Sequence, residues 1–211
     1  KEYMERHDVP GEIVVFGAPA EEIGGSKQYF ARQGLMNGVD AFIGLHPVGF
    51  VNGVMLKRHL ASSSRQYHFY GRTAHAALAP DKGINALTSL EFFNLGVQML
   101  RAQIPDGRRI NHVITLGGEV SNMIPDHAIV DYSLRAEELE YLTKLTEQVD
   151  RVARAAAEAF GCRLEVRDLG TIANSVPNMT LSRIAQENAE AIGASRRRSS
   201  GCSRRCRAWS R

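Results

Sequence analysis

The sequence of 211 residues has three cysteines, one tryptophan and no long apolar run. So few cysteines do not indicate a disulfide framework, and a reducing, cytoplasmic location is expected. No apolar run approaches the roughly 20 residues that a membrane-spanning helix needs, so no membrane partner is expected. The chain opens Lys1-Glu2-Tyr3-Met4 without a secretory signal, and we expect it to be a fragment. Its 44% hydrophobic and 23% charged residues are typical of a globular protein.

Acidic residues are absent from the carboxyl end, where residues 196–211 hold seven arginines. Of the 26 basic residues, 19 remain elsewhere against 23 acidic ones, which gives the rest of the chain a net charge of −4. The tail fits either a basic arm for nucleic acid or a non-native end such as a reading-frame shift produces. We favour the second, because the preceding helix stops without a proper ending and the Cys202–Cys206 spacing is one residue too long for a zinc knuckle. No nucleic-acid partner is therefore expected.

A pair of carboxylates follows the first apolar run of the chain. Residues 13–16 are Ile-Val-Val-Phe, Gly17 and Pro19 end the run, and Glu21 and Glu22 come next. Such a pair is typical of the first turn of a helix, where negative charge suits the positive end of the helix dipole. It also fits a hydrolase in which one carboxylate binds a metal and the other faces the attacking water.

A second apolar run, residues 41–45, ends at His46. A helix is predicted between the runs, over residues 25–33, so the segment is expected to form a strand–helix–strand unit with parallel strands. Ligands of open parallel sheets bind outside the carboxyl ends of the strands, which is where Glu21, Glu22 and His46 are placed. Glu, Glu and His are a common set of zinc ligands and general base, although His46 alone also fits a capping or core residue.

The period of the apolar residues changes near residue 61. Alternating residues predict four strands, and apolar residues spaced by three and four predict two long helices. In chain order these strands and helices cover residues 62–70, 84–103, 110–116, 127–135, 142–159 and 162–167. The order β-α-β-β-α-β is the ferredoxin-like plan. We therefore predict an α/β protein in which a ferredoxin-like βαββαβ domain is inserted into a partial doubly wound domain, followed by a helix near residues 178–192.

Five motifs occur in a fixed order along the two predicted domains: Ala18–Glu22, Gly44–His46, Gly71–Ala77, Asn122–Asp126 and Leu134–Ala136. Together they resemble the aminoacylase/carboxypeptidase-type zinc peptidases and amidohydrolases. Within that family the chain is similar to the aminobenzoyl-glutamate hydrolase and amino-acid-conjugate amidohydrolase group. The resemblance covers about residues 10 to 193.

This resemblance implies how the chain is divided into domains. Residues 1–57 would be the first part of a catalytic α/β domain, which resumes over residues 170–195. Residues 58–169 would form a lid and dimerisation domain, and residues 196–211 a non-native or disordered tail. A homodimer through the lid domain is therefore expected.

The resemblance also implies roles for the residues of the first domain. Glu21 matches the general base, and Glu22 and His46 match metal ligands. A divalent metal lowers the pKa of a bound water to about 7, and a nearby carboxylate then takes the proton and passes it to the leaving amine. Zinc is expected, and manganese and cobalt suit the same carboxylate and imidazole ligands.

Three residues of the inserted domain match family positions. His75 matches the lid histidine, which reaches the active site of the partner subunit and polarises the scissile carbonyl. Asn122 matches a substrate-binding asparagine, and Arg135 matches the arginine that grips the free carboxylate of the substrate, to which a planar guanidinium is suited. Asn122 and Arg135 have simpler alternatives, since asparagine also forms turns and Arg135 also fits the polar face of a strand.

The predicted function is metal-dependent hydrolysis of the amide bond of a small N-acyl amino acid or dipeptide-like substrate. In the family the first metal ligands lie upstream of Lys1 and the last one lies well beyond residue 193. We therefore expect this polypeptide by itself to bind zinc weakly and to hydrolyse little. The alternative is a non-catalytic dimeric interaction or regulatory module in which the ferredoxin-like domain carries the function.

Overall fold

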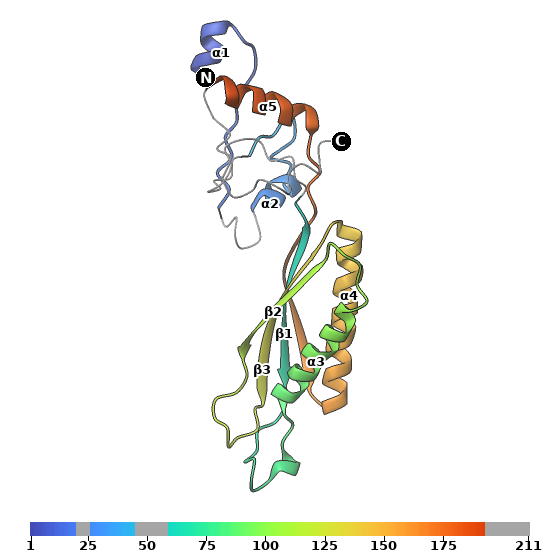
Figure 1. Ribbon diagram of the computed structural model, residues 1–211. Coiled ribbons are helices and arrows are strands. Elements are labelled where there is room, and N and C mark those ends of the chain that lie inside the picture. Colours follow the sequence, from blue (N-terminus) through green and yellow to red (C-terminus); the bar gives the residue numbers. More distant parts are fainter. Residues whose placement is uncertain (20–25, 45–58, 193–211) are drawn as a thin grey trace. The chain divides into compact units, whose positions relative to one another are not determined.

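The computed structural model of the protein describes residues 1–19, 26–44 and 59–192 (Figure 1). The chain divides into two compact units, residues 1–44 and residues 45–211. Within the described residues, no helix combines the length and apolar composition that crossing a bilayer requires.

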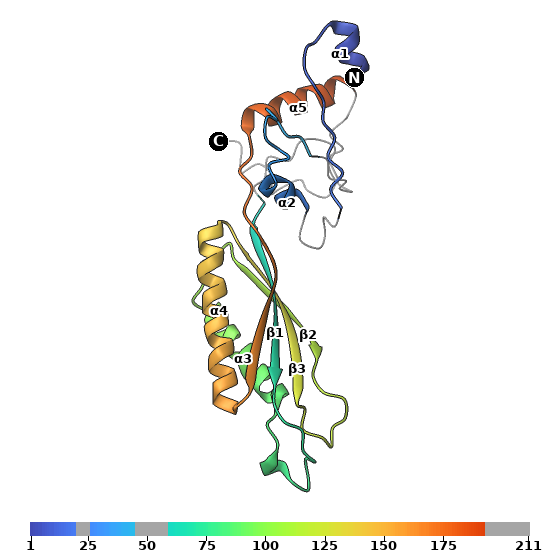
Figure 2. The same ribbon diagram turned by 180° about the vertical axis from the view of Figure 1, so that it is seen from behind.

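The second unit contains a four-stranded antiparallel sheet with the strand order β2-β3-β1-β4. Two long helices, α3 and α4, pack against each other and cover one face of this sheet (Figures 1 and 2). In chain order these elements are β1 Ala61–Tyr70, α3 Ala86–Arg101, β2 Arg109–Leu116, β3 His127–Ala136, α4 Leu139–Phe160 and β4 Arg163–Ile172. The predicted βαββαβ order is confirmed, with most element ends within two or three residues of the prediction.

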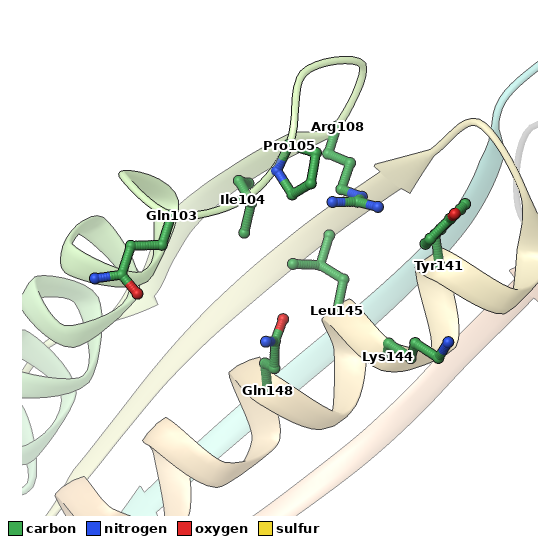
Figure 3. Close-up of a pocket in the computed structure, with 8 residues that line it drawn as sticks. All are labelled: Gln103, Ile104, Pro105, Arg108, Tyr141, Lys144, Leu145 and Gln148. Atoms are coloured by element: carbon green, nitrogen blue, oxygen red, sulfur yellow. The ribbon is translucent and has the colours of Figure 1, made fainter.

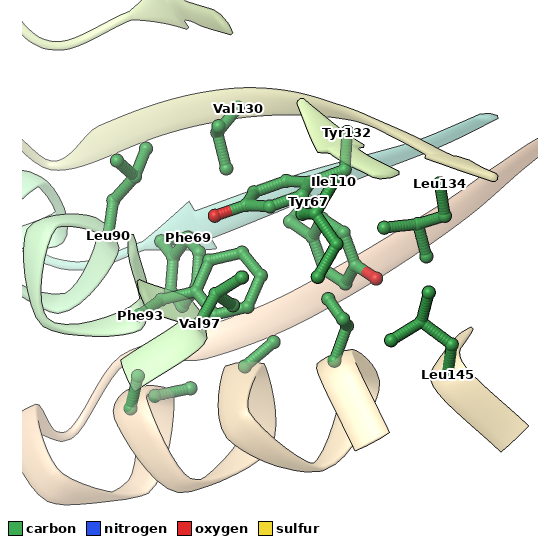
Figure 4. Packing of buried hydrophobic residues seen from close by; sticks show 14 of the residues in the cluster. Tyr67, Phe69, Leu90, Phe93, Val97, Ile110, Val130, Tyr132, Leu134 and Leu145 are labelled. Carbon is green, nitrogen blue, oxygen red and sulfur yellow. The ribbon is translucent and has the colours of Figure 1, made fainter. Parts of the chain in front are cut away.

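The core lies between the sheet and the two helices, as Figure 4 shows. Alternate residues of β3 are buried, as the period-two pattern predicts, because successive side chains of a strand point to opposite faces. Aromatic rings fill the centre: Tyr67 lies 4.8 Å from Phe93 and 5.7 Å from Tyr132 between ring centroids. Burial of these large apolar surfaces is the main favourable contribution to folding of this unit.

The ends of the helices follow sequence signals. Asn85 caps α3 by accepting a hydrogen bond from the Thr88 amide at 3.0 Å. Gly161 ends α4 with φ of 70°, a left-handed conformation that glycine adopts without steric cost. The predicted stop at Gly161 is therefore confirmed.

A polar group is buried under α4 without losing its hydrogen bond. The Tyr67 hydroxyl donates to an Asp150 carboxylate oxygen at 2.7 Å. The Arg65 guanidinium lies 3.6 Å from a carboxylate oxygen of Asp150 and 3.7 Å from one of Asp168. Its positive charge therefore offsets the negative charge of Asp150 beside the Tyr67 hydroxyl. Burial, together with the hydrogen bond to Asp150, raises the pKa of Tyr67, so the phenol stays protonated in the core.

The sheet face opposite the helices carries a directed chain of side-chain hydrogen bonds. Gln66 donates to Asp131 at 2.8 Å, so its amide oxygen is left to accept from His68 Nε2, also at 2.8 Å. Neutral His68 then accepts at Nδ1, and His127 Nε2 is the donor at 3.2 Å. His68 is 4% exposed although it lies on this open face.

The first unit contains helices α1 (Glu2–His7) and α2 (Ser26–Arg32), and α2 lies close to the helix predicted at residues 25–33. Phe16 lies 6.1 Å from Phe30 and 5.8 Å from Phe42 between ring centroids, so aromatic contacts join its segments.

The strands predicted in the first unit are not reproduced: residues 12–16 and 41–44 form no strand. Their apolar side chains are largely exposed, at 88% for Val15 and 70% for Ile43. A strand is stable only beside a hydrogen-bonded neighbour, and the described part of this unit supplies none. The doubly wound arrangement and the predicted domain limits therefore stay predictions.

The second unit also contains a last helix, α5 (Met179–Ala191), where the sequence predicts a helix near residues 178–192.

We predict that the second unit loses stability as the pH falls from 7.5 to 5. Burial, and then the charges of Arg167 and His127, lower the pKa of His68, while Glu165 and Asp131 oppose the shift. Because the folded pKa lies below the ordinary value of about 6.5, the unfolded chain takes up the proton first as the pH falls through that value. Urea unfolding at several pH values should give a smaller pH slope for His68→Gln than for the wild type.

His7→Gln, which changes an exposed residue of α1, is the control for this measurement and should leave the slope unchanged. A remaining slope in His68→Gln is expected from His112, whose pKa is also lowered by burial. Identical slopes for His68→Gln and the wild type would contradict the assignment of the pH dependence to His68.

Candidate active site

The pairing of β1 with β3 continues past the ends of both strands. Residues 71–77, which follow β1, run beside residues 122–126, which precede β3, and both loops extend from the same end of the sheet (Figure 1). Three backbone hydrogen bonds join them: Gly71 N to Asp126 O at 2.8 Å, Ile124 N to Ala74 O at 2.9 Å and Ala76 N to Asn122 O at 2.9 Å. The structure thus brings together two motifs that are separated by about 50 residues of sequence.

Gly71 is required by this close approach of backbones. Arg72 and Ile84 form an isolated antiparallel bridge, with hydrogen bonds of 2.9 and 2.8 Å in the two directions. A Cβ atom on Gly71 would lie 2.0 Å from the carbonyl oxygen of Ile84. Any side chain at this position would therefore push the loop that carries His75 away from the start of α3.

His75 is partly exposed, and the backbone of its own loop fixes the orientation of its ring. Its Nδ1 atom accepts hydrogen bonds from the amides of Ala77 at 3.2 Å and Leu78 at 3.3 Å. An atom that accepts two N–H groups carries no proton, so neutral His75 holds its proton on Nε2. The ring therefore presents an N–H donor on the side away from its own loop, which is the group that a developing oxyanion needs.

Asn122 lies beside His75 through their backbones. Its carbonyl accepts from Ala76, and the preceding turn is closed by the Met123 amide, which donates to Val120 O at 3.3 Å. Asn122 is thus a turn residue, as its simpler interpretation predicts. Its side chain is exposed and forms no hydrogen bond with the described residues, so it is also available to a substrate.

Arg135 lies at the opposite end of β3 from these loops. Eight residues separate it from His127, where β3 begins, and at about 3.3 Å per residue this is about 26 Å. The structure therefore does not bring Arg135 together with His75 and Asn122 of the same chain.

A second arginine, which the sequence did not single out, lies directly opposite Arg135. The register of β2 and β3 pairs Arg109 with Arg135, and both side chains are exposed. Like charges in this arrangement repel each other, and neither guanidinium has an ion pair with the described residues. The pair therefore forms a cationic site suited to an anionic group.

Glu21, Glu22 and His46 lie outside the described residues, so their positions as base and metal ligands stay predictions. Elsewhere, the part of the chain that the structure describes holds no group of three or more His, Cys, Asp or Glu side chains able to bind a metal. The described residues thus include the predicted His75, Asn122 and Arg135 but none of the predicted metal ligands.

Comparison with known proteins accounts for the arrangement of the second unit. Residues 61–160, from the start of β1 to the end of α4, match the family model of the peptidase dimerisation domain. The chain belongs to the M20 family of peptidases and amidohydrolases. The family resemblance that the five motifs predicted is confirmed.

Relatives of this M20 chain include named hydrolases. It is 31% identical over 182 residues to a p-aminobenzoyl-glutamate hydrolase polypeptide of Escherichia coli (strain K12), a match over 86% of the chain and 38% of that protein. It is also 31% identical over 185 residues to Xaa-Arg dipeptidase of Mus musculus, a match over 87% of the chain and 42% of that protein. The chain thus spans less than half the length of these relatives.

A solved structure shares the fold of the M20 chain. The aminobenzoyl-glutamate utilization protein from Klebsiella pneumoniae superposes with a TM-score of 0.64 at 27% sequence identity. The match covers 84% of this chain and 46% of that one.

We predict that the neutral form of His75 is the Nε2–H tautomer. Both hydrogen bonds to Nδ1 are lost in the other tautomer, so the loop backbone selects against it. Long-range ¹⁵N–¹H correlation spectra of the neutral ring should show a pyridine-like Nδ1 and a protonated Nε2. A protonated Nδ1 in the neutral ring would contradict the prediction, and a His75→Gln sample identifies the resonances.

Proposed function

We propose that the protein hydrolyses the amide bond of a small N-acyl amino acid or dipeptide-like substrate. The observation that carries the proposal is the orientation of His75, whose Nε2–H is directed away from its loop by two backbone amides. Relatives named p-aminobenzoyl-glutamate hydrolase and Xaa-Arg dipeptidase support this substrate class.

In this proposal Glu21 is the general base, and Glu22 and His46 would help to hold a divalent metal, which we expect to be zinc, with manganese or cobalt as alternatives. When bound, the metal would make a water nucleophilic at neutral pH by lowering its pKa. Glu21 takes a proton from the attacking water and returns it to the leaving amine. His75 donates its Nε2–H to the oxygen on which negative charge develops.

The separation of Arg135 from His75 supports a site shared between two subunits. A dipeptide spans at most about 7 Å, far less than the length of β3 that lies between these residues. One substrate therefore cannot contact both side chains of a single chain. We propose that Arg135, with Arg109 beside it, binds the substrate carboxylate in one subunit, while His75 and Asn122 come from the partner.

The edge of the sheet at β2 is the surface on which we place the second copy. β2 is an outer strand of the described sheet, and its sequence Arg-Ile-Asn-His-Val-Ile-Thr-Leu contains neither lysine nor proline to block pairing. Val113 and Ile114 are exposed on this edge. A twofold axis at β2 would satisfy its unpaired backbone groups in both copies. The match to a dimerisation domain supports this placement.

The first experiment tests whether the site is shared. The gene product is expressed with the coding DNA that flanks residues 1 and 211, and two variants, Glu21→Gln and His75→Ala, are prepared. Each should lose most of its turnover, and Glu21→Gln should still bind metal, because the amide replaces the base and not a ligand. Mixed one to one and allowed to exchange, the two inactive variants should recover about a quarter of the wild-type rate, since half of the dimers carry one complete site.

Native mass spectrometry of the mixed Glu21→Gln and His75→Ala dimers, whose subunits differ in mass, is the control for subunit exchange. No recovery in a mixture that demonstrably exchanges would place His75 in the site of its own chain and remove the shared site. Retained turnover in Glu21→Gln would remove Glu21 from the role of base. An inactive wild type that remains dimeric would favour a non-catalytic dimeric module.

The second experiment tests the dimer surface. Val113→Lys places a charge on the proposed contact edge and should shift the protein from dimer to monomer in light scattering, because two lysines would meet across the twofold axis. Leu95→Lys, on an exposed position of α3 outside that edge, is the matched control and should remain a dimer. Dissociation by Leu95→Lys but not by Val113→Lys would place the contact on α3 instead.

A further inference from the structure

A pocket of about 230 Å³ lies between the connection from α3 to β2 and the first half of α4 (Figure 3). Ile104 and Pro105 line it from the connection, and the Leu145 side chain points into it from α4. Gln103 and Gln148 add two amide groups. The pocket therefore has an apolar floor with neutral polar groups at its side.

The only formal charges in the lining of this pocket are positive. Arg108 extends over the ring of Tyr141, with its guanidinium carbon 4.6 Å from the ring centroid. Lys144 is also in the lining, but its amine already pairs with Glu140 at 2.6 Å. Arg108 is partly buried and forms no ion pair with the described residues, so one cation at the pocket is left without a counter-charge.

We infer that this pocket binds a small carboxylate that has an apolar body. The planar guanidinium of Arg108 is suited to bind a carboxylate through two parallel hydrogen bonds, and Tyr141 holds that guanidinium in place. The apolar body would lie against Ile104 and Leu145. A volume of about 230 Å³ is below the usual range of about 300–1,000 Å³ for drug-sized ligands, so the occupant is small.

The pocket is separate from the candidate active site. It is built with α4 and so lies on the helix-covered side of the sheet, whereas Arg109 and Arg135 pair on the sheet itself and His75 lies beyond its far end. His75, Arg109 and Arg135 do not line it, although the Arg109 guanidinium donates to the backbone carbonyl of Arg108 at 2.8 Å. The inference therefore stands or falls independently of the proposed hydrolysis.

Titration calorimetry of the complete 211-residue chain with benzoate tests the inference. Benzoate should bind, benzamide and inorganic phosphate should bind much more weakly, and Arg108→Gln should weaken benzoate binding about tenfold or more, because a charge-assisted hydrogen-bonded pair is lost. The effect of Arg108→Gln should be absent for benzamide, which has the same ring and no charge.

Two charge-matched variants locate the site. Arg154→Gln removes an exposed guanidinium of α4 outside the pocket and should bind benzoate as the wild type does. Arg135→Gln, which removes one of the proposed substrate-binding arginines, shows whether benzoate binds there instead. Loss of binding in Arg135→Gln but not in Arg108→Gln would overturn the inference, as would equal binding of benzoate and benzamide, phosphate binding as tight as benzoate binding, or no benzoate binding at millimolar concentrations. If Arg108→Gln does not fold, Tyr141→Leu serves as the second variant, and unchanged benzoate affinity there would also overturn it.

Discussion

The antiparallel pairing of β1 with β3 is the interaction on which the rest of the second unit depends. The two strands are the inner pair of the sheet and match residue for residue from Ala61 with Ala136 to Tyr70 with His127. This register places Tyr67 and Tyr132 on the helix side, where they meet Phe93. The same register runs on into the loops, so the pairing that builds the core also sets His75 beside Asn122. A slip of one residue would reverse the faces and misplace both.

A rigid sheet also fixes how far apart its functional ends can be. His75 and Asn122 lie beyond one end of the β1–β3 pair, and Arg135 and Arg109 lie at the other. A strand cannot shorten to bring them together, so any substrate smaller than the sheet meets only one end of a given chain. In our proposal a second copy supplies the other end of the site, and the match of residues 61–160 to a dimerisation domain supports that proposal.

His68 of β1 and His75 of the loop that follows it are fixed by different kinds of partner. His75 accepts at Nδ1 from two backbone amides, a partner set that depends only on the loop conformation. His68 is held between Gln66 and His127 by side chains from two strands. The first arrangement leaves Nε2 free to donate outward, whereas the second uses both ring nitrogens within the protein. Similar rings thus serve different purposes, catalytic in our proposal for His75 and structural for His68.

Local patterns in the sequence determined the elements of the second unit. Three such signals are the alternation in residues 127–135, the helical spacing over residues 142–159 and the glycine at position 161. Each depends only on residues that are close in sequence, so each predicts a strand, a helix or a helix end before the fold is known. The motifs that contain His75, Asn122 and Arg135 identified the family for the same reason. Similar local reasoning failed for residues 12–16 and 41–44, because an apolar run becomes a strand only where a neighbour pairs with it.

Tertiary structure alone decided the relations between distant residues. Strand register joins residues that are far apart in the chain. It brings His75 beside Asn122, separates both from Arg135 by the length of β3, and pairs Arg109 with Arg135. The approach of Arg108 to Tyr141 depends on how α4 lies over the sheet. These contacts result from packing over the whole unit, and no local period in the sequence encodes them.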